Sequence, residues 1–258
     1  MIGIDHTFLK PGFVVVSMDT IGVICAPDDA VFGRVAERLA ARGFHVEFFS
    51  PGEPIQPVDI DALDALVNQS LRRQALAALH YADHNGIETW NGYLATTALA
   101  CRLVAFHALE RVGCPVPHIS LEKPQGEHVE MTRYCWDGPP AISGGGDFYR
   151  AQVSTESVVH KYYALDDGIE THLTAITLRS KLTEDERILE ETDVRVELAT
   201  RIRELLDRSD ARAICVDFVA DDEDEYYAVG VDPVPSFDGA DMDRRVADSM
   251  ASLTTIGA

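Results

Sequence analysis

Lysine is almost missing from this chain, and basic residues in general are few. Of its 258 residues, 22 are Lys or Arg and 43 are Asp or Glu, which gives a formal net charge of −21. The only lysines are Lys10, Lys123, Lys161 and Lys181. A surface of this charge repels nucleic acids and anionic membranes, so we expect neither as a partner. Acidic residues spread along the whole chain are typical of a halophile's cytoplasmic protein, and most carboxylates are expected to serve solvation.

Long apolar runs, paired cysteines and the common catalytic motifs are also absent. No apolar stretch approaches about 18 residues and the N-terminus has no signal-peptide pattern, which predicts a soluble, untargeted protein. The five cysteines form no CxxC pair, so we expect reduced thiols in a cytoplasm. There is no P-loop or GxSxG motif, and no GxGxxG follows the first expected strand. His80 and His84 lie four residues apart, but without a third ligand nearby we predict no zinc site.

The first third of the chain alternates between strand and helix patterns. Apolar runs predict strands at residues 21–25, 45–49 and 65–68. Helical spacing predicts one helix from an Asp28 or Asp29 cap to Gly43, and another over residues 71–83. This alternation predicts a small parallel-sheet lobe that ends near Trp90. A chain of 258 residues is long for one domain, so two lobes or subdomains are expected.

The rest of the chain mixes helices with further strands. Residues 93–112 form the clearest helical pattern, with Gly113 at the C′ position and a stiff connector fixed by Pro115 and Pro117. Strands are predicted at residues 118–122, 129–136, 158–164 and 173–178, a surface turn at 183–186, and helices at 194–206 and 241–253.

Two carboxylates are predicted to lie side by side in a hairpin near the C-terminus. Residues 214–219 and 226–231 are β-branched and aromatic-rich runs around an acidic turn. If the turn is the four residues 222–225, Asp217 lies opposite Gly230, and Asp232 is a diagonal neighbour about 7–8 Å away. Buried carboxylates need a compensating cation, so this pair suggests a divalent metal with oxygen ligands. The alternative is an exposed hairpin in a very acidic protein.

Three consecutive glycines, Gly144, Gly145 and Gly146, follow the expected strand at residues 129–136. Glycine lets backbone N–H groups approach an anion closely, as in loops that cover phosphates. A glycine triplet on its own is more often a mobile turn.

The hairpin resembles the closing hairpin of the ATP-grasp superfamily, in particular the RimK-like carboxylate–amine ligases. The resemblance rests on Asp217, on Gly230-Val231-Asp232-Pro233, and on Pro235-Ser236-Phe237-Asp238-Gly239. It implies an α+β ATP-grasp fold with a small N-terminal α/β lobe. The expected domains are residues 1–91 for this pre-ATP-grasp lobe and 92–258 for the nucleotide-binding region, with subdomains of about 92–161 and 162–258.

The resemblance also implies ATP and Mg²⁺ as cofactors and assigns roles to residues. Arg102 and Arg133 would contact phosphates and act in catalysis, and Asp217 and Asp232 would hold the metal. The remaining expected cofactor contacts are the glycine loop Gly144, Gly145 and Gly146, the adenine-binding hinge strand with Lys161, Tyr162 and Tyr163, and the strand opening with Glu170 and His172.

Three of the departures from the family pattern fall at positions that normally carry charge. Met131 stands where a lysine is usual, His172 where Arg or Lys is usual, and Gly230 where a metal-binding Glu is usual. The main expectation is therefore an ATP-dependent ligase that activates a small carboxylate as an acyl phosphate for attack by an amine. The alternatives are a catalytically degenerate pseudoenzyme used as a binding protein, and a small-molecule kinase of the same fold. The substrate and the oligomeric state are left open.

Overall fold

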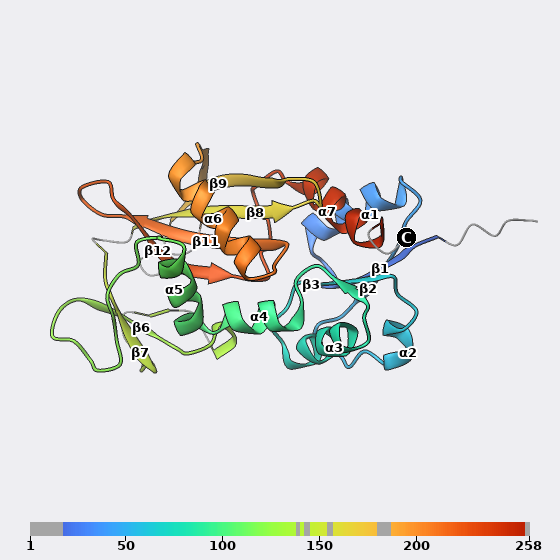
Figure 1. The fold of residues 1–258 in the computed structure, drawn as a ribbon, viewed down its shortest axis with the longest axis horizontal. Coiled ribbons are helices and arrows are strands. Elements are labelled where there is room, and N and C mark those ends of the chain that lie inside the picture. Colours follow the sequence, from blue (N-terminus) through green and yellow to red (C-terminus); the bar gives the residue numbers. More distant parts are fainter. Residues whose placement is uncertain (1–17, 138–139, 142–144, 154–156, 180–186, 256–258) are drawn as a thin grey trace, which may run out of the picture.

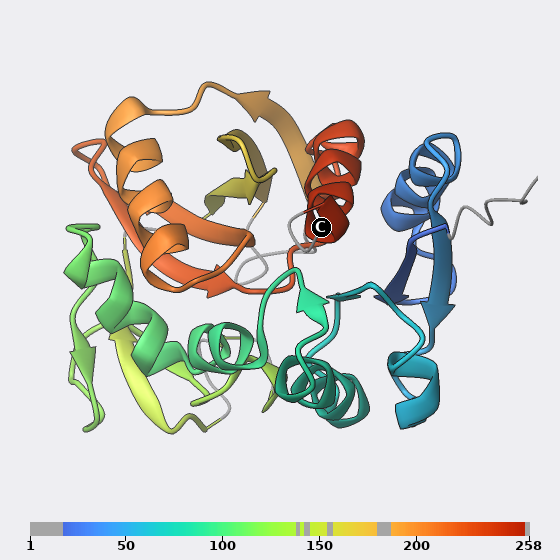
Figure 2. The same ribbon diagram turned by 45° about the vertical axis from the view of Figure 1, so that its right-hand side comes forward.

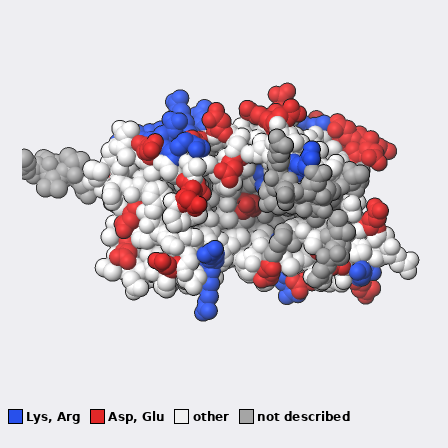
Figure 3. All heavy atoms as spheres, turned by 180° about the vertical axis from the view of Figure 1, so that it is seen from behind, with Lys and Arg blue, Asp and Glu red and all other residues white. Residues whose placement is uncertain are grey.

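A computed structural model describes residues 18–137, 140–141, 145–153, 157–179 and 187–255. This part of the chain forms three sheets with helices packed around them. The N-terminal sheet lies at one end of the molecule and the two other sheets lie together at the opposite end (Figure 1). Its cysteines are all free thiols, in agreement with the sequence. None of the helices in these ranges is long and apolar enough to cross a membrane. Acidic side chains are spread over the face drawn in Figure 3, whereas basic ones gather in fewer places.

The N-terminal sheet is parallel, as predicted, with strand order β2-β1-β3-β4. Asp29 caps its first helix by accepting hydrogen bonds from the N–H groups of Val31 and Phe32, both 3.0 Å long. The elements are β1 (Thr20–Ile24), α1 (Ala30–Ala40), β2 (His45–Phe49), α2 (Pro57–Ile60), β3 (Ala65–Asn68), α3 (Arg73–His84) and β4 (Glu88–Thr89).

The expectation of one helix over residues 93–112 is wrong. The structure has α4 (Tyr93–Ala100) and α5 (Arg102–Arg111), separated by Cys101 in an extended conformation with φ −81° and ψ 103°. Cys101 forms an isolated antiparallel bridge with Tyr134, and the N–H of Arg102 donates to the carbonyl of Arg133 at 2.9 Å. This tertiary pairing overrides the helical periodicity, and Arg102 becomes the first residue of a helix.

A five-stranded antiparallel sheet, with order β10-β9-β8-β11-β12, forms the largest layer. One face packs on α5 and α6 through apolar residues that include Phe106, Ile202 and Val216. The strand β10 was not predicted. The elements are β8 (Val158–Asp166), β9 (Thr171–Arg179), β10 (Arg187–Thr192), α6 (Val196–Arg208), β11 (Ala213–Ala220) and β12 (Tyr226–Asp232). The surface turn expected at residues 183–186 lies outside the described residues.

A small antiparallel sheet, with order β5-β7-β6, faces the large one. Its strand β6 ends at Met131, so the strand predicted to run to Trp136 is too long, and β7 was not predicted. The elements are β5 (Ile119–Ser120), β6 (His128–Met131), the 3₁₀ turn η1 (Cys135–Asp137) and β7 (Phe148–Ala151).

The last helix, α7 (Asp243–Thr255), returns to the N-terminal lobe and packs beside α1 (Figure 2). Ion pairs join Arg34 to Asp243 and Arg42 to Asp248 across this contact. One hydrophobic core contains side chains of the N-terminal sheet, of α7 and of the large sheet. The division into residues 1–91 and 92–258, with subdomains at about 92–161 and 162–258, stays a prediction.

Asn91 connects the end of the N-terminal lobe to the large sheet. Its side chain is buried, and its Nδ2 donates to the carbonyls of Ala213 at 2.6 Å and Pro233 at 2.7 Å. Its Oδ1 accepts from the N–H groups of Arg212 at 2.8 Å and Ala213 at 3.0 Å. All the polar atoms of this amide are therefore satisfied by backbone groups more than a hundred residues away.

Substituting Asn91→Asp is expected to destabilise the protein by about 3 kcal/mol or more, because it removes both N–H donors and aims a buried carboxylate at two carbonyls. Urea unfolding of the purified variant measures the change. Asn85→Asp is the matched control, since Asn85 is exposed and its side chain donates to the carbonyl of Tyr81 at 2.8 Å within its own helix terminus. Equal losses in the two variants would contradict a special role for Asn91.

Candidate functional site

A cleft of about 550 Å³ lies between the large sheet and the β5-β7-β6 sheet. Its apolar lining includes Phe106, Met131, Val159, Leu178 and Val231. Among the described residues, its charged lining consists of four cationic side chains and two carboxylates, namely Arg102, Arg150, Lys161, Arg179, Asp217 and Asp232. In a chain with a net charge of −21, a cleft with more cations than carboxylates is a local reversal of the surface charge.

The predicted placement of Asp217 and Asp232 is confirmed. Asp217 pairs with Gly230, and Asp232 pairs with Cys215 on the same two strands, so the carboxylates are diagonal neighbours. The hairpin loop is one residue longer than predicted, because Ala220 pairs with Tyr226. A bulge between Asp217 and the next pair of the ladder compensates for this extra residue.

Both carboxylates belong to one electrostatic environment. The Nζ of Lys161, on the neighbouring strand β8, lies 3.8 Å from Oδ1 of Asp217. Oδ1 of Asp232 accepts a hydrogen bond from the N–H of Val234 at 2.9 Å. Burial raises the pKa of the Cys215 thiol well above its ordinary value, and the charges of Asp217 and Asp232 raise it further. The thiol therefore stays protonated at neutral pH.

The two aspartates offer the kind of ligands that suit a magnesium ion. Mg²⁺ is usually held by one or two carboxylates, with waters and substrate phosphates completing its coordination. Within the described ranges, no group of three or more His, Cys, Asp or Glu side chains could hold a metal. Gly230 leaves the third position open, because a Cβ added there would lie 3.8 Å from Oδ2 of Asp217, an ordinary contact distance.

Arg102 lines the cleft from the first turn of α5. Its guanidinium donates to the carbonyls of Thr132 and Tyr134, both at 2.9 Å, and to the hydroxyl of Thr132. The break at Cys101 gives Arg102 this place, since the residue would otherwise lie in the middle of a helix. The side chain thus joins the segment after β6 to the start of α5. Arg102 is also one of the residues that line the cleft.

Arg150 and Arg179 were missed in the sequence. Arg150 is the third residue of β7, is only 2% exposed, and lines the cleft next to the apolar floor. Arg179 is the last residue of β9. A charged residue within a buried strand is itself a signal of a functional site, but it can be used only where the strand has been recognised.

Arg133, Gly145 and Gly146 are not among the described residues that line the cleft. Arg133 is exposed and follows the end of β6, so it does not belong to the strand that was predicted at residues 129–136. A Cβ on Gly146 would come within 2.7 Å of the backbone nitrogen of Met131, which explains the glycine by close packing. The N–H of Gly145 donates to the carboxylate of Glu130 at 2.5 Å, and Gly144 lies outside the described residues.

The strand β8 brings only one of its three predicted contacts to the cleft. The side chain of Lys161 lines it, whereas those of Tyr162 and Tyr163 are buried on opposite faces of the sheet. Tyr162 packs on Phe218 and Tyr163 stacks on Phe237. All three residues pair with β9 and with β11, so their backbone groups take part in the ladders of the sheet.

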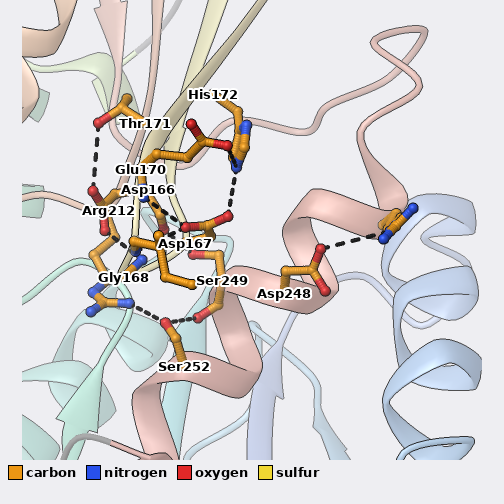
Figure 4. A network of polar contacts seen from close by, with 12 residues as sticks. Asp166, Asp167, Gly168, Glu170, Thr171, His172, Arg212, Asp248, Ser249 and Ser252 are labelled. Carbon is orange, nitrogen blue, oxygen red and sulfur yellow. Dashed lines mark hydrogen bonds and ion pairs between the residues drawn. The ribbon is translucent and has the colours of Figure 1, made fainter.

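Glu170 and His172 lie at the β8–β9 turn (Figure 4). Neither is among the described residues that line the cleft. The ring of His172 lies 2.6 Å from the carboxylate of Asp167, which also accepts from the N–H groups of Ile169 and Glu170 at 2.9 Å. Burial raises the pKa of Asp167, but these hydrogen bonds outweigh it and lower the pKa to about 2. The structure therefore gives His172 a partner within the turn.

The same turn is fastened to α7. The hydroxyl of Ser249 donates to the carbonyl of Asp166 and accepts from the indole N–H of Trp90 at 2.7 Å. Arg212 donates to Ser252 at 2.5 Å on the same helix (Figure 4). These contacts indicate a structural role for the turn.

Comparison with known proteins identifies the fold. No protein-family model and no curated sequence matches the chain. The solved structures similar to it include the ATP-grasp ligase PsnB complexed with a phosphomimetic variant of its minimal precursor, Mg and ADP, at 18% identity and a TM-score of 0.64, covering 92% of this chain and 100% of that one. The macrocyclase MdnC of Microcystis aeruginosa MRC, bound with the precursor peptide MdnA, matches at 9% identity and a TM-score of 0.65, with coverages of 93% and 100%.

A third similar structure is N5-carboxyaminoimidazole synthetase from Staphylococcus aureus, at 12% identity and a TM-score of 0.62, covering 89% of this chain and 77% of that one. The chain has the ATP-grasp fold. The α+β architecture with its small N-terminal α/β lobe, which the hairpin residues predicted, is confirmed.

The Asp167 interactions predict a defined pH dependence. A folded-state pKa of about 2, below the ordinary 3.8, means that these interactions stabilise the protein fully above the ordinary value and are lost as the pH falls towards 2. Asp167→Asn is therefore expected to be less stable than the wild type at pH 7, with a difference that shrinks below pH 4. Urea unfolding from pH 7 down to the lowest pH at which both proteins fold measures this difference. A difference that stays constant over the range would contradict the assignment.

Proposed function

We propose that this protein binds ATP with Mg²⁺ in the cleft and acts as an ATP-dependent ligase that joins a carboxylate to an amine. The observation that carries the proposal is the cationic lining around Asp217 and Asp232, within a protein of net charge −21. A polyphosphate is the ligand that such a lining suits, because Arg and Lys pair with phosphate oxygens. Asp217 and Asp232 would hold a magnesium ion, which offsets phosphate charge.

The chemistry requires two displacements. A carboxylate oxygen of the substrate attacks the γ-phosphorus of ATP, the bond to the β-γ bridging oxygen breaks, and ADP leaves with the acyl phosphate formed. An amine then attacks the acyl carbon, inorganic phosphate leaves, and the amine loses a proton as the amide forms. When bound, Mg²⁺ would neutralise charge on the phosphates.

The residues of the cleft divide this work between them. Arg102, Arg150, Lys161 and Arg179 would hold phosphate oxygens and offset charge that develops on the transferred group. The apolar part of the lining, which includes Val159 and Leu178, would contact the adenine ring of ATP. Roles for Arg133, for Gly144, Gly145 and Gly146, for Tyr162 and Tyr163, and for Glu170 and His172 stay predictions from the resemblance. In the cleft, Arg150 and Arg179 supply charge that Met131 lacks.

The similar structures support the same class of reaction. PsnB is described as an ATP-grasp ligase complexed with Mg and ADP, and MdnC as a macrocyclase bound with a precursor peptide. A nucleotide and a carboxylate substrate, either small or part of a peptide, are therefore the proposed partners. The competing proposal is a degenerate relative that binds ligands without turnover, and the features that favour it are Met131 and Gly230 in the lining.

Calorimetric titration with ATP tests the proposal. We expect binding that is at least about tenfold tighter with Mg²⁺ than with EDTA, and a loss of most of this gain in Asp217→Asn and in Asp232→Asn, because each removes a charged oxygen ligand. Asp207→Asn on the exposed surface of α6 is the control. Binding of ATP that ignores Mg²⁺ would refute the metal role of the two aspartates, and failure to bind ATP would refute the nucleotide site.

Gly230→Glu tests the open position of the metal site. The contact distance of 3.8 Å leaves room for a side chain beside Asp217, so a third carboxylate is expected to lower the Mg²⁺ concentration for half-maximal ATP binding severalfold. Gly230→Gln has the same length without the charge and is expected to leave that concentration unchanged. Equal effects of the two substitutions would show that the side chain acts by its bulk, and would contradict the prediction.

A further inference from the structure

A second hollow, a groove of about 960 Å³, adjoins the cleft. It runs along the first turns of α3, past Tyr93 at the start of α4, to Trp136 in η1, and α3 and α4 lie next to each other in Figure 1. Leu71 and Trp136 line both the groove and the cleft, so the two hollows meet there. A ligand that lies in the groove can therefore reach the cleft.

The groove carries cationic side chains at the N-terminal end of α3. Its charged or titratable lining side chains are Arg72, Arg73, His80 and Tyr93, and no Asp or Glu of the described chain lines it. Arg72 and Arg73 are exposed, and neither makes an ion pair with another described residue. The chain has 43 acidic residues against 22 basic ones, so two neighbouring arginines without a carboxylate beside them form a local positive field.

Two details fix the shape of the groove. Gly52 forms part of its wall, and a Cβ added there would lie 3.0 Å from Nη1 of Arg72, so the glycine makes room for the guanidinium. Trp136 is 41% exposed and stacks on Tyr134 with ring centroids 4.5 Å apart and an interplanar angle of 7°. A flat apolar wall and two guanidinium groups face the same space.

We propose that this groove binds the carboxylate substrate, and that the substrate carries at least two anionic groups. The proposal rests on the proposed ligase function. Arg72 and Arg73 line the groove but not the cleft, so a carboxylate that they hold is not the one that meets ATP. The first group stays at these arginines, and the second reaches past Leu71 and Trp136 into the cleft for activation. The substrate is thus a dicarboxylic acid or an acidic peptide segment, with the carboxylates as the shared chemistry.

Binding measurements without turnover test this inference. The probes are glutarate against pentanoate, and a blocked hexaglutamate peptide against a blocked hexaglutamine peptide, titrated at low ionic strength because salt screens exposed charges. The readouts are calorimetry and the emission of Trp136, since Trp90 is only 2% exposed. We expect glutarate, the acidic peptide or both to bind, and their neutral or singly charged counterparts to bind at least about tenfold more weakly.

The double variant Arg72→Gln with Arg73→Gln is expected to lose about tenfold or more of the anion affinity and to keep wild-type ATP affinity. Arg244→Gln with Arg245→Gln is the matched control, a neighbouring and exposed arginine pair on α7. Binding of glutarate alone identifies a small diacid as the substrate class, and binding of the peptide alone identifies a peptide segment.

Three results would overturn the inference: no binding of either glutarate or the acidic peptide, equal binding of an anion that does bind and of its neutral or singly charged counterpart, or unchanged affinity in the Arg72 and Arg73 variant. If ATP binds while the anions do not, the groove is refuted and the nucleotide site stands. If the anions bind while ATP does not, the ligase function is refuted and the anion site stands.

Discussion

The placement of the site depends on one buried amide, that of Asn91. Its N–H groups hold the carbonyl of Ala213, two residues before Cys215 in β11, and that of Pro233, the residue after Asp232 in β12. Both strands that carry the carboxylates are therefore fixed at the same end to the segment that leads into α4. Because backbone groups buried without partners cost about 1–3 kcal/mol each, a shift of this hairpin relative to the N-terminal lobe is strongly opposed. This connection therefore constrains the position of the cleft relative to the groove.

A second constraint is the break between α4 and α5. The uninterrupted helix would satisfy more backbone groups within itself, but it would place Arg102 away from the segment that follows β6. Pairing Cys101 with Tyr134 replaces the missing helical bonds by bonds to that segment, and the guanidinium of Arg102 adds its own. Trp136, which closes the cleft and forms the wall of the groove, lies two residues further along. The break thus couples the lining of both hollows to one helix terminus.

The sequence was most informative where local chemistry determines structure. The parallel lobe, the Asp29 cap and the Gly113 terminus follow from periodicity and from the preferences of single residues. The pairing of Asp217 with Gly230 was also predicted, although the assumed turn was one residue too short, because the bulge in β12 cancels the difference. The register of a hairpin is fixed by loop and bulge together, and neither can be read separately from such an acidic turn.

The sequence was least informative where distant segments meet. The pattern of residues 93–112 does not predict that Cys101 pairs with Tyr134. The strand β7 is too short and too mixed in polarity to be recognised, so Arg150 was overlooked. Arg133 was expected within a strand over residues 129–136, whereas β6 ends at Met131. His172 was assigned as a substitute for a cationic residue of the family, whereas the structure pairs it with Asp167 five residues earlier.

A strongly acidic protein that binds ATP must overcome a repulsive field with local contacts. Surface charges are screened over about 10 Å at 0.1 M salt, so the acidic exterior repels an anion only at short range. Inside the cleft the interaction with an anion is attractive. Arg150 and Arg102 are only 2% and 9% exposed, so their charges are screened much less than those of the surface. Arg72 and Arg73 in the adjoining groove are exposed, so their charges are screened more strongly than those of the buried arginines. Anion recognition in this fold would therefore rest on a few buried cations whose positions the backbone fixes, and the remaining surface is left to solvation.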